Sequence, residues 1–169
     1  ENPSTFNKDD RDLFTNKTIL DAKNEARFID QLTDFENDKK AVIDGFTVKN
    51  GNAEGFYVSR VPSSLTAAFE DEFVGGALRL KDNVTVSHCD IYNNVSNNGG
   101  AIYANNTNND KNIVVSYSKI HDNYAHDEGG ALSIHRNYVW MDTPRDSIIN
   151  CEISNNKSDR FGGLSIKMM

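Results

Sequence analysis

The sequence predicts an all-β fold: a right-handed parallel β-helix with three strands per coil and about four to five coils. Three observations predict it. A double-glycine string begins at Gly75, Gly99 and Gly129 and again at Gly162, so one building block is repeated along the chain. Short alternations of apolar and polar residues follow each glycine pair, as in strands with one buried face. Asparagine, which tolerates the left-handed backbone of tight turns, follows each unit's last apolar piece.

Length and charge limit the classes of function. The chain has 169 residues, enough for one domain with its own core, and its net charge is −7. An acidic chain is poorly suited to nucleic acid, so no nucleic-acid partner is expected. No run of eighteen apolar residues occurs, so no transmembrane segment is expected. The opening "ENPSTFNKDD" lacks a methionine and a signal peptide, which predicts a mature or excised piece of a longer protein.

Residues 1–40 are expected to form a diverged N-terminal coil or cap. The strings "TILDAK" and "ARFIDQL" fit one degraded coil. Phe28, Leu32 and Phe35 also have near-helical spacing, so a short helix is the alternative. Residues 41–169 are expected to hold the β-helix repeats, with the string "AVIDGFTVKNG" as an early, diverged unit.

Each unit is expected to contribute three short strands. The first follows the glycines, and its alternation places Leu78 and Leu80 inward and Ala77 and Arg79 outward. The second and third strands are separated by a single bend residue, because Asp, Asn and His often adopt positive φ. These bend residues are Asp44, His88, Tyr117 and Asn150. The asparagines expected to stack in a ladder after the third strand are Asn50, Asn94, Asn123 and Asn156.

The two cysteines are expected to be free thiols. Cys89 and Cys151 take the same place in their units, and Ser118 takes it in the unit between them. Coils stack about 4.8 Å apart, so two coils separate the cysteines by about 10 Å. A disulfide needs less than about 7 Å between α-carbons. Both side chains are predicted to point inward and to be buried.

The repeat motifs carry a resemblance to known proteins. The strings "DGFTVKNGNA" and "GGALRL", and "IYNN", "IHDN" and "ISNN" before later glycine pairs, resemble the right-handed parallel β-helix family of pectate-lyase-like solenoids. They are similar to the GGA(I/L)/FxxN repeats of polymorphic outer-membrane proteins and of large secreted Bacteroidetes proteins. The resemblance covers about residues 41–167. Ile91, Ile120 and Ile153 replace the phenylalanine of FxxN. The resemblance implies a secreted or bacterial cell-surface location.

Two insertions are the first candidates for ligand binding, because solenoid loops can grow while the core cannot. They span residues 52–74 and 135–146. Exposed aromatic side chains are typical of sugar-binding surfaces, although such residues also fold back over a core edge. The candidate ligand-binding residues are Phe56, Tyr57, Tyr138 and Trp140.

The outward face of the first sheet is the second candidate. Alternation predicts one column of Arg79, Tyr103, Ser133 and Ser165 and a second of Lys81, Asn105, His135 and Lys167. In β-helix polysaccharide lyases the same sheet carries the active site, where a basic residue acts on an acidic sugar, often with calcium. The resemblance therefore implies that Arg79, Lys81, Tyr103 and His135 are the candidate catalytic residues of a lyase. A solvated sheet face would show the same mixture of residues.

Metal ligands give a weak signal. The four histidines have no metal-binding spacing, so no zinc site is expected. The acidic strings "EDE" at 70–72 and "HDE" at 126–128 are compatible with calcium binding or with charged side chains that are simply exposed to solvent. No cofactor is expected other than Ca²⁺ at such sites.

Two functions remain open. The first is a non-enzymatic, adhesin-like module of a larger surface protein or complex, with loops that bind a glycan or a protein. The alternative is a polysaccharide lyase or glycoside hydrolase that acts on an acidic glycan through the first sheet. The final string "GGLSIKMM" stops within a coil, so the open end of the solenoid is expected to be covered by further chain or by a partner.

Overall fold

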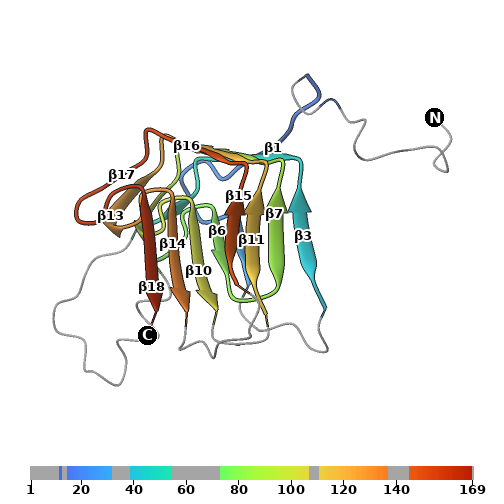
Figure 1. The fold of residues 1–169 in the computed structure, drawn as a ribbon. Coiled ribbons are helices and arrows are strands. Elements are labelled where there is room, and N and C mark those ends of the chain that lie inside the picture. The colour runs from blue at the N-terminus through green and yellow to red at the C-terminus, as the bar shows by residue number, and fades with distance from the viewer. Residues whose placement is uncertain are drawn as a thin grey trace, which may run out of the picture.

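The predicted parallel β-helix is confirmed. The structure is a computed structural model that describes residue 12 and residues 15–31, 39–54, 73–106, 111–136 and 145–168. These residues form eighteen strands and no helix, and the strands are arranged in four parallel sheets (Figure 1). Every strand pairs in parallel with the equivalent strand of a neighbouring coil.

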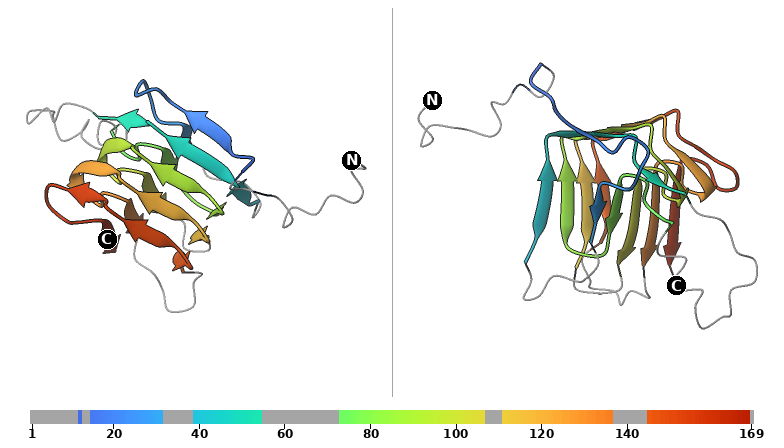
Figure 2. Two further views of the ribbon diagram at one scale, coloured as in Figure 1. Left: turned by 90° about the horizontal axis from the view of Figure 1, so that it is seen from above. Right: turned by 180° about the vertical axis from the view of Figure 1, so that it is seen from behind.

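Two sheets contain five strands each. Figure 2 shows sheet A from above as a row of parallel rungs in chain order. It consists of β1 (Thr18–Asp21), β4 (Phe46–Lys49), β8 (Asp90–Tyr92), β12 (Lys119–His121) and β16 (Glu152–Ser154). Sheet B consists of β2 (Ile29–Asp30), β6 (Leu78–Leu80), β10 (Ile102–Asn106), β14 (Leu132–Arg136) and β18 (Leu164–Met168).

The other two sheets contain four strands each. Sheet C consists of β3 (Ala41–Asp44), β7 (Val84–Ser87), β11 (Ile113–Ser116) and β15 (Ser147–Ile149). Sheet D consists of β5 (Asn52–Ala53), β9 (Val95–Asn98), β13 (Tyr124–Glu128) and β17 (Lys157–Ser158). A complete coil thus runs through sheets B, C, A and D in turn. Sheet D is a fourth strand in each coil beyond the three expected from the sequence. Its strands are mostly polar and lack the apolar alternation that marked the other three.

Aliphatic columns fill the interior of the solenoid. Along sheet B, one column runs from Leu78 through Ile102 and Leu132 to Leu164. A second column runs from Leu80 through Ala104 and Ile134 to Ile166. Along sheet A the inward column is Leu20, Val48, Ile91, Ile120 and Ile153. Side chains in the middle coils are fully buried, whereas those of the last coil are half-buried or exposed. Each coil therefore depends on its neighbours for a core.

The expected outward position of Ala77 is wrong, because Ala77 is fully buried in the core cluster. It lies at the corner before β6, where the chain turns into the sheet. Its N–H donates to the Ala101 carbonyl of the next coil at 2.9 Å. Simple alternation fails there, since a corner does not continue the pleat of the strand.

The bend residues follow the prediction in three coils. His88, Tyr117 and Asn150 have φ of 50°, 49° and 52°. In the first regular coil the bend lies at Gly45, with φ of 80°, and not at the predicted Asp44. Asp44 pairs with Ser87, the last residue of β7, so Gly45 is the equivalent of His88.

The asparagine ladder forms from three of its four predicted members. The Asn94 Nδ2 donates to Asn123 Oδ1 at 2.8 Å, and the Asn123 Nδ2 donates to Asn156 Oδ1 at 2.9 Å. Gly51, and not Asn50, takes the first place, and its N–H donates to Asn94 Oδ1 at 2.8 Å. Asn50 instead occupies the positive-φ position one residue earlier, with φ of 57°.

Both cysteines are free, as predicted, but only one is buried. Cys89 is 3% exposed, and burial raises the pKa of its thiol. Cys151 is half-buried, so its predicted burial is wrong. It lies in the last coil, where no further coil among the described residues covers it. Ser118 separates the two cysteines, and its hydroxyl accepts a hydrogen bond from the Cys89 N–H at 3.1 Å.

Candidate functional site

The outer face of sheet B brings most of the predicted lyase candidates together. Arg79, Tyr103, Ser133 and Ser165 are paired in one column, as predicted. Asn105, His135 and Lys167 form the neighbouring column. Lys81 is not part of it, because β6 ends at Leu80. The N–H of Lys81 donates instead to the Gln31 side chain at 2.9 Å.

A hydroxyl–imidazole network lies at the centre of this face. The Tyr103 hydroxyl lies 3.2 Å from Nδ1 of His135, and the two rings meet edge to face at 5.0 Å. The Ser133 hydroxyl lies 3.3 Å from the other ring nitrogen of His135. Ser133 is fully buried and Tyr103 is 5% exposed. The central members of this outward column are therefore buried and not open to solvent.

Glu128 extends the network at the C-terminal side. It is a buried residue at the end of β13, and it accepts hydrogen bonds from Lys167 and, at 2.9 Å, from Ser165. Burial by itself raises the pKa of the Glu128 carboxyl. The hydrogen bonds from Lys167 and Ser165 outweigh burial and hold that pKa below its ordinary value. Glu128 is thus a carboxylate at neutral pH, and it neutralises the ammonium group of Lys167.

The basic groups of the face are largely matched by acids. Arg79 lies 3.5 Å from Asp30 of the neighbouring strand β2. Lys167 is paired with Glu128. A lyase needs a basic group that is available to an acidic sugar or to its α-proton. The pairing of Arg79 and Lys167 with acids compensates these two positive charges and weighs against the lyase alternative.

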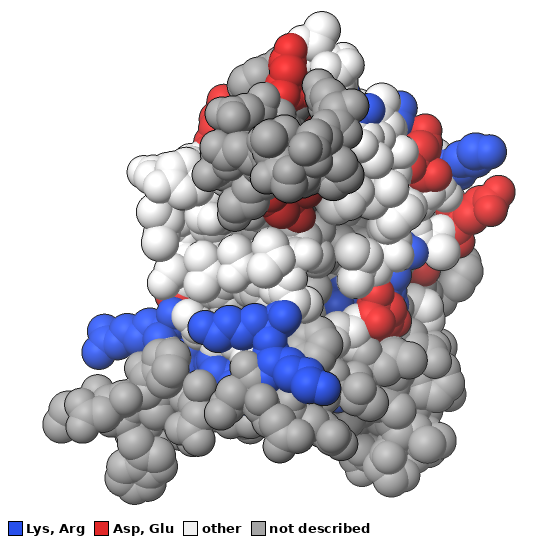
Figure 3. Space-filling model, turned by 90° about the vertical axis from the view of Figure 1, so that its right-hand side faces the viewer, with Lys and Arg blue, Asp and Glu red and all other residues white. Residues whose placement is uncertain are grey.

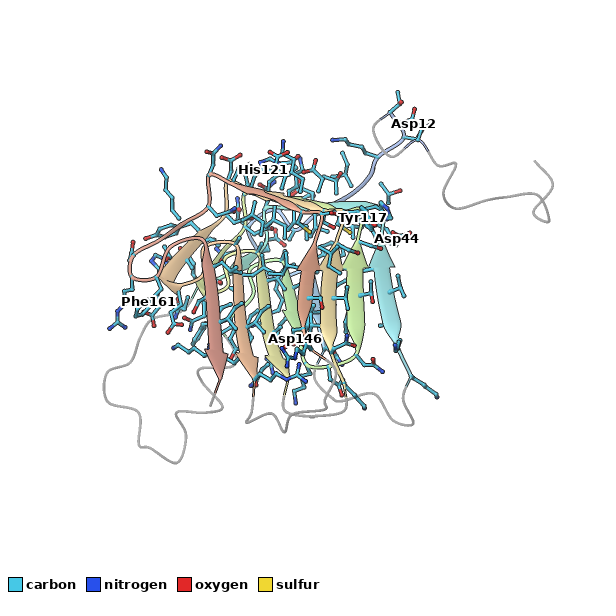
Figure 4. The ribbon with its side chains drawn as sticks, viewed as in Figure 1. Asp12, Asp44, Tyr117, His121, Asp146 and Phe161 are labelled. Carbon is cyan, nitrogen blue, oxygen red and sulfur yellow. The ribbon has the colours of Figure 1, made fainter. Side chains whose placement is uncertain are left out.

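Two buried ion pairs, which the sequence analysis did not find, stabilise the corner between sheets B and C. Lys111 lies 3.1 Å from Asp82, and Arg136 lies 3.1 Å from Asp146. The exposed fractions of these four side chains lie between 1% and 12%. Figure 4 shows Asp146 at the end of sheet C opposite the corner that carries Tyr117. One signal for these ion pairs was present in the sequence: charged residues recur just before or after the short apolar stretches of three repeat units.

The four aromatic candidates, Phe56, Tyr57, Tyr138 and Trp140, lie outside the described residues. Parts of the two predicted insertions are described. The insertion at 52–74 begins with β5 and ends with Val74, which bridges to Asn98 of the next coil. The insertion at 135–146 begins with the last two residues of β14 and ends with the buried Asp146.

Variation in loop length is confined to the two corners that flank sheet B. The corner between sheets A and D has two residues in every coil: Asn50–Gly51, Asn93–Asn94, Asp122–Asn123 and Asn155–Asn156. The corner between sheets C and A is equally constant in the repeat register. The segments between described ranges, 32–38, 55–72, 107–110 and 137–144, each connect sheet B to sheet C or sheet D to sheet B. One end of each of these segments therefore lies where a strand of sheet B begins or ends.

The outer face of sheet A carries a second group of titratable side chains. The imidazole of His121 lies 3.0 Å from Asp90 and 2.6 Å from Asp122, and its ring stacks on Tyr92 at 5.1 Å. Figure 4 shows His121 at the top of the solenoid, at the opposite end from Asp146. Lys17 lies 3.2 Å from Asp90. The group is a surface network of matched charges.

An open hollow of about 320 Å³ lies beside this face. It is lined by Asp122, Asn123, Tyr124, Asn155 and Lys157. The Tyr124 hydroxyl donates to Asp159 at 2.7 Å, and this bond raises the pKa of Tyr124. The hollow is open to solvent, and its lining exposes about as much apolar as polar surface.

The acidic string at 126–128 is engaged by neighbouring side chains. His126 lies 2.7 Å from Glu54, Asp127 lies 2.8 Å from Arg160, and Glu128 binds Lys167. Among the described residues no group of three histidine, cysteine or acidic side chains is arranged to hold a metal ion. The string at 70–72 lies outside these residues. In the same described part of the chain, no helix is long and apolar enough to cross a membrane.

Comparison with known proteins gives one family match. Residues 88–105 match the Chlamydia polymorphic membrane protein repeat. This stretch includes β8, β9 and most of β10, and it contains Ile91 and Asn94, which fill the core and the ladder, and the glycine pair that starts the next coil. No curated protein and no solved structure matches the chain. The residues of the matched stretch named above, Ile91, Asn94 and the glycine pair, thus all have roles in forming the coil.

Proposed function

We propose that this chain is a non-enzymatic, adhesin-like β-helix module of a bacterial surface protein, and that the side carrying sheet B binds an extracellular glycan. A surface or outer-membrane location is supported by the polymorphic membrane protein repeat at residues 88–105. Binding at sheet B is supported by one observation above others: each segment of variable length between described ranges begins or ends at a strand of this sheet.

The chemistry of these loops favours a glycan. Trp140, Tyr138, Phe56 and Tyr57 all belong to segments that connect to sheet B. Aromatic rings stack on the apolar faces of sugars, and they do so at low cost in conformational entropy. The base of the loop that carries Trp140 is held by the buried pair of Arg136 and Asp146. A loop with a rigid base loses less conformational freedom when it binds a ligand.

The test is a glycan array on the purified chain, followed by titration of each glycan that binds. Trp140→Ala is expected to weaken binding at least tenfold, whereas Lys119→Ala on the loop-free face of sheet A is the control and leaves binding unchanged. Lys119 is exposed and its partner Glu152 is exposed too, so this control does not disturb the core. Equal effects of the two substitutions would exclude sheet B as the binding side.

A second variant removes an entire loop without changing the register of the coils. Ala53 pairs with Ser96 and Val74 bridges to Asn98, so removal of residues 54–72 leaves Phe73 in the place of Asn97. The shortened chain is expected to keep its strand content by circular dichroism. A shortened, folded chain that binds glycans as before would assign recognition to the 137–144 segment alone.

The lyase alternative has its own readout in the same samples. Eliminative cleavage of an acidic glycan produces an unsaturated product that absorbs ultraviolet light. Cleavage that disappears in Arg79→Ala or Lys81→Ala would replace the adhesin proposal with the lyase. The absence of both binding and cleavage across acidic and neutral glycans would overturn the glycan proposal.

A further inference from the structure

Four basic side chains lie along the corner between sheets B and C. In Figure 1 the strands of sheet B run toward the bottom of the view and those of sheet C run upward from it, so this corner lies at the bottom. Its described segments are 39–40, 81–83, 111–112 and 145–146. Figure 3, seen from the side of β3, shows basic side chains gathered in the lower part of the molecule. We call the exposed and half-buried basic residues of these segments the basic edge: Lys39, Lys40, Lys81 and Arg145.

The positive charges of the basic edge are not neutralised by acids. Within the described part of the chain, none of its four members forms an ion pair. The same segments contain two acidic side chains, and both are bound to other bases. Asp82 lies 3.1 Å from Lys111. Asp146 lies 3.1 Å from Arg136. The basic edge is therefore a local concentration of positive charge on a chain whose net charge is −7.

The backbone that carries these charges is held in place. The Lys39 carbonyl accepts a hydrogen bond from the Asn83 side chain at 2.5 Å. The N–H of Lys81 donates to Gln31 Oε1 at 2.9 Å, so the tight turn after β6 is fixed to the preceding coil. Charged groups on a fixed backbone lose less conformational freedom when they bind a ligand.

The basic edge runs along the solenoid axis. The strands β3, β7, β11 and β15 are paired in one register. The residues one place before Ala41 and its equivalents therefore form a column, which consists of Lys40, Asn83, Asn112 and Arg145. The Asn112 side chain donates to the Arg145 carbonyl at 3.4 Å. Three coil spacings of about 4.8 Å separate Lys40 from Arg145, so the positive charges extend over about 14 Å.

This arrangement matches a linear polymer better than a small anion. Charges that are spread along a line do not converge on a single phosphate or sulfate group, whereas they complement a chain with anionic groups at intervals. Nucleic acid is a poor partner, because its dense phosphate charge is repelled by an acidic protein. A polysaccharide also offers sugar rings to aromatic side chains. The segment 137–144, which contains Trp140, ends directly before Arg145.

We propose that the basic edge binds a linear acidic polysaccharide, whose carboxylate or sulfate groups contact its four basic side chains. This inference rests on the proposed glycan-binding function and specifies the class of glycan. The polysaccharide lies along the solenoid axis, where the strands of sheet B end. Binding there requires neither Arg79 nor Lys167, which are paired with acids on the outer face of the sheet.

The test compares three polysaccharides that share one sugar backbone and differ in charge: dextran, carboxymethyl dextran and dextran sulfate. The two charged forms are expected to bind the full chain at least about tenfold more tightly than dextran at low salt. This advantage is expected to shrink as sodium chloride is raised from about 50 mM to about 500 mM, because salt screens exposed charges. A preference between the two charged forms identifies the anionic group that the edge selects.

Two variants remove charge from opposite ends of the basic edge. The double substitution Lys39→Gln and Lys40→Gln, and separately Arg145→Gln, are each expected to weaken binding of the charged dextrans at least about fivefold. Neither is expected to change the binding of neutral glycans. Lys157→Gln is the matched control, because Lys157 is exposed in β17 of sheet D and, within the described part of the chain, has no ion pair. The thermal midpoint of each variant shows that the fold is retained.

Equal binding of the three dextrans would overturn the proposal. Equal losses in Lys157→Gln and in the basic-edge variants would overturn it too, since the net charge alone would then explain the effect. Duplex DNA that binds as tightly as dextran sulfate would show a general attraction to polyanions and would also contradict it.

The same titrations separate this proposal from the proposed function. Neutral glycans that bind through Trp140, without any contribution from the basic edge, would refute this inference and leave the proposed function intact. Charge-dependent binding that survives Trp140→Ala would support the basic edge and remove Trp140 from the proposed function. The absence of binding to every glycan would overturn both.

Discussion

At the scale of single residues, this molecule depends on polar side chains that satisfy buried backbone groups. Asn123 is the clearest case. Its Oδ1 accepts from two donors of Asn94, and its Nδ2 lies 3.0 Å from the Ile91 carbonyl and 2.9 Å from the His121 carbonyl. Its side chain is buried, so water does not replace these partners. One carboxamide thereby satisfies the corner backbone of two coils.

The substitution Asn123→Ala is expected to lower the free energy of unfolding by about 2–4 kcal/mol, because several buried donors and acceptors lose their partners together. Chemical denaturation measures the change. The control is Asn112→Ala, since Asn112 is half-buried and makes one long hydrogen bond, to the Arg145 carbonyl at 3.4 Å. Similar losses in the two variants would contradict a special role for the ladder.

Glu128 is expected to make stability depend on pH on the acid side. Its pKa is held below the ordinary glutamate value of 4.5, so its contribution is fully present above that value and is lost as the pH falls through the lowered pKa. At pH 7, Glu128→Gln is expected to cost about 1–2 kcal/mol, in part because Lys167 loses its partner. This difference should shrink below about pH 4.5, where protonated Glu128 resembles glutamine.

The measurement is urea denaturation of the two chains from pH 7 to pH 3. Glu152→Gln is the matched control, because Glu152 is exposed and pairs with the exposed Lys119. Such exposed pairs contribute little. A difference between wild type and Glu128→Gln that stays constant down to pH 3 would contradict the assignment.

At the scale of single elements, the close stacking of corners sets which residues are tolerated. Gly76, Gly100 and Gly130 form a column in which each backbone touches the carbonyl groups of the following coil. The strands have only two to five residues, and one residue of slippage would turn their core side chains outward. The glycine column and the asparagine ladder together fix the register.

Gly100→Ala is expected to destabilise the chain by several kcal/mol, because the new methyl group would lie 2.2 Å from the Gly130 carbonyl oxygen and the coils would have to separate. The measurement is the thermal midpoint, with Gly163→Ala as the nearly neutral comparison. A small and equal effect of both substitutions would show that the coils shift apart easily.

Much of this element-level architecture was predictable from the sequence. The repeats at Gly75, Gly99 and Gly129 and the aliphatic alternation after them predicted the paired columns of sheet B. The prediction failed at corners, where Ala77 is buried and Gly45 replaces Asp44 as the bend. Alternation describes a pleated strand, whereas the direction of a corner residue depends on the coils above and below it. The errors in register, Asp44 in place of Gly45 and Asn50 in place of Gly51, both fall in the diverged first unit.

The candidate site was less predictable than the fold. The sequence placed Tyr103 and His135 on one face, and the structure brings their side chains into contact. It gave no indication that Glu128 would bind Lys167 and Ser165, because the bulge between Ala125 and Glu128 redirects the end of β13. The buried pair of Lys111 and Asp82 was missed for a similar reason. Contacts between residues thirty positions apart depend on the lengths of the intervening loops.

At the scale of the whole molecule, stability is expected to be graded along the solenoid axis. The middle coils are covered on both sides, whereas β1 and β18 are each covered on one side. The fully buried side chains, including Ile91, Ile102 and Ile120, lie in these middle coils. In a repeat architecture each coil is stabilised mainly by its nearest neighbours, so the ends open more easily than the middle.

Native-state hydrogen exchange is expected to be slowest at β7, β8, β10 and β11 and to increase toward both ends of the molecule. Within sheet B, the amides of β10 should exchange at least about tenfold more slowly than those of β18, although both strands have the same local sequence pattern. Uniform protection along sheet B would indicate that the chain unfolds as a single unit.

The confinement of variable loops to the edges of sheet B has a consequence for evolution and engineering. The length of the connecting segments varies along one side of the molecule, while the corner between sheets A and D has two residues in each of the four coils that contain a sheet D strand. Successive coils can therefore diversify independently and still present their new segments in the same direction. Peptides grafted in place of residues 107–110 and 137–144 would follow strands one coil apart. The solenoid is thus suited to multivalent display, in which the stacking distance of the coils sets the spacing of the displayed epitopes.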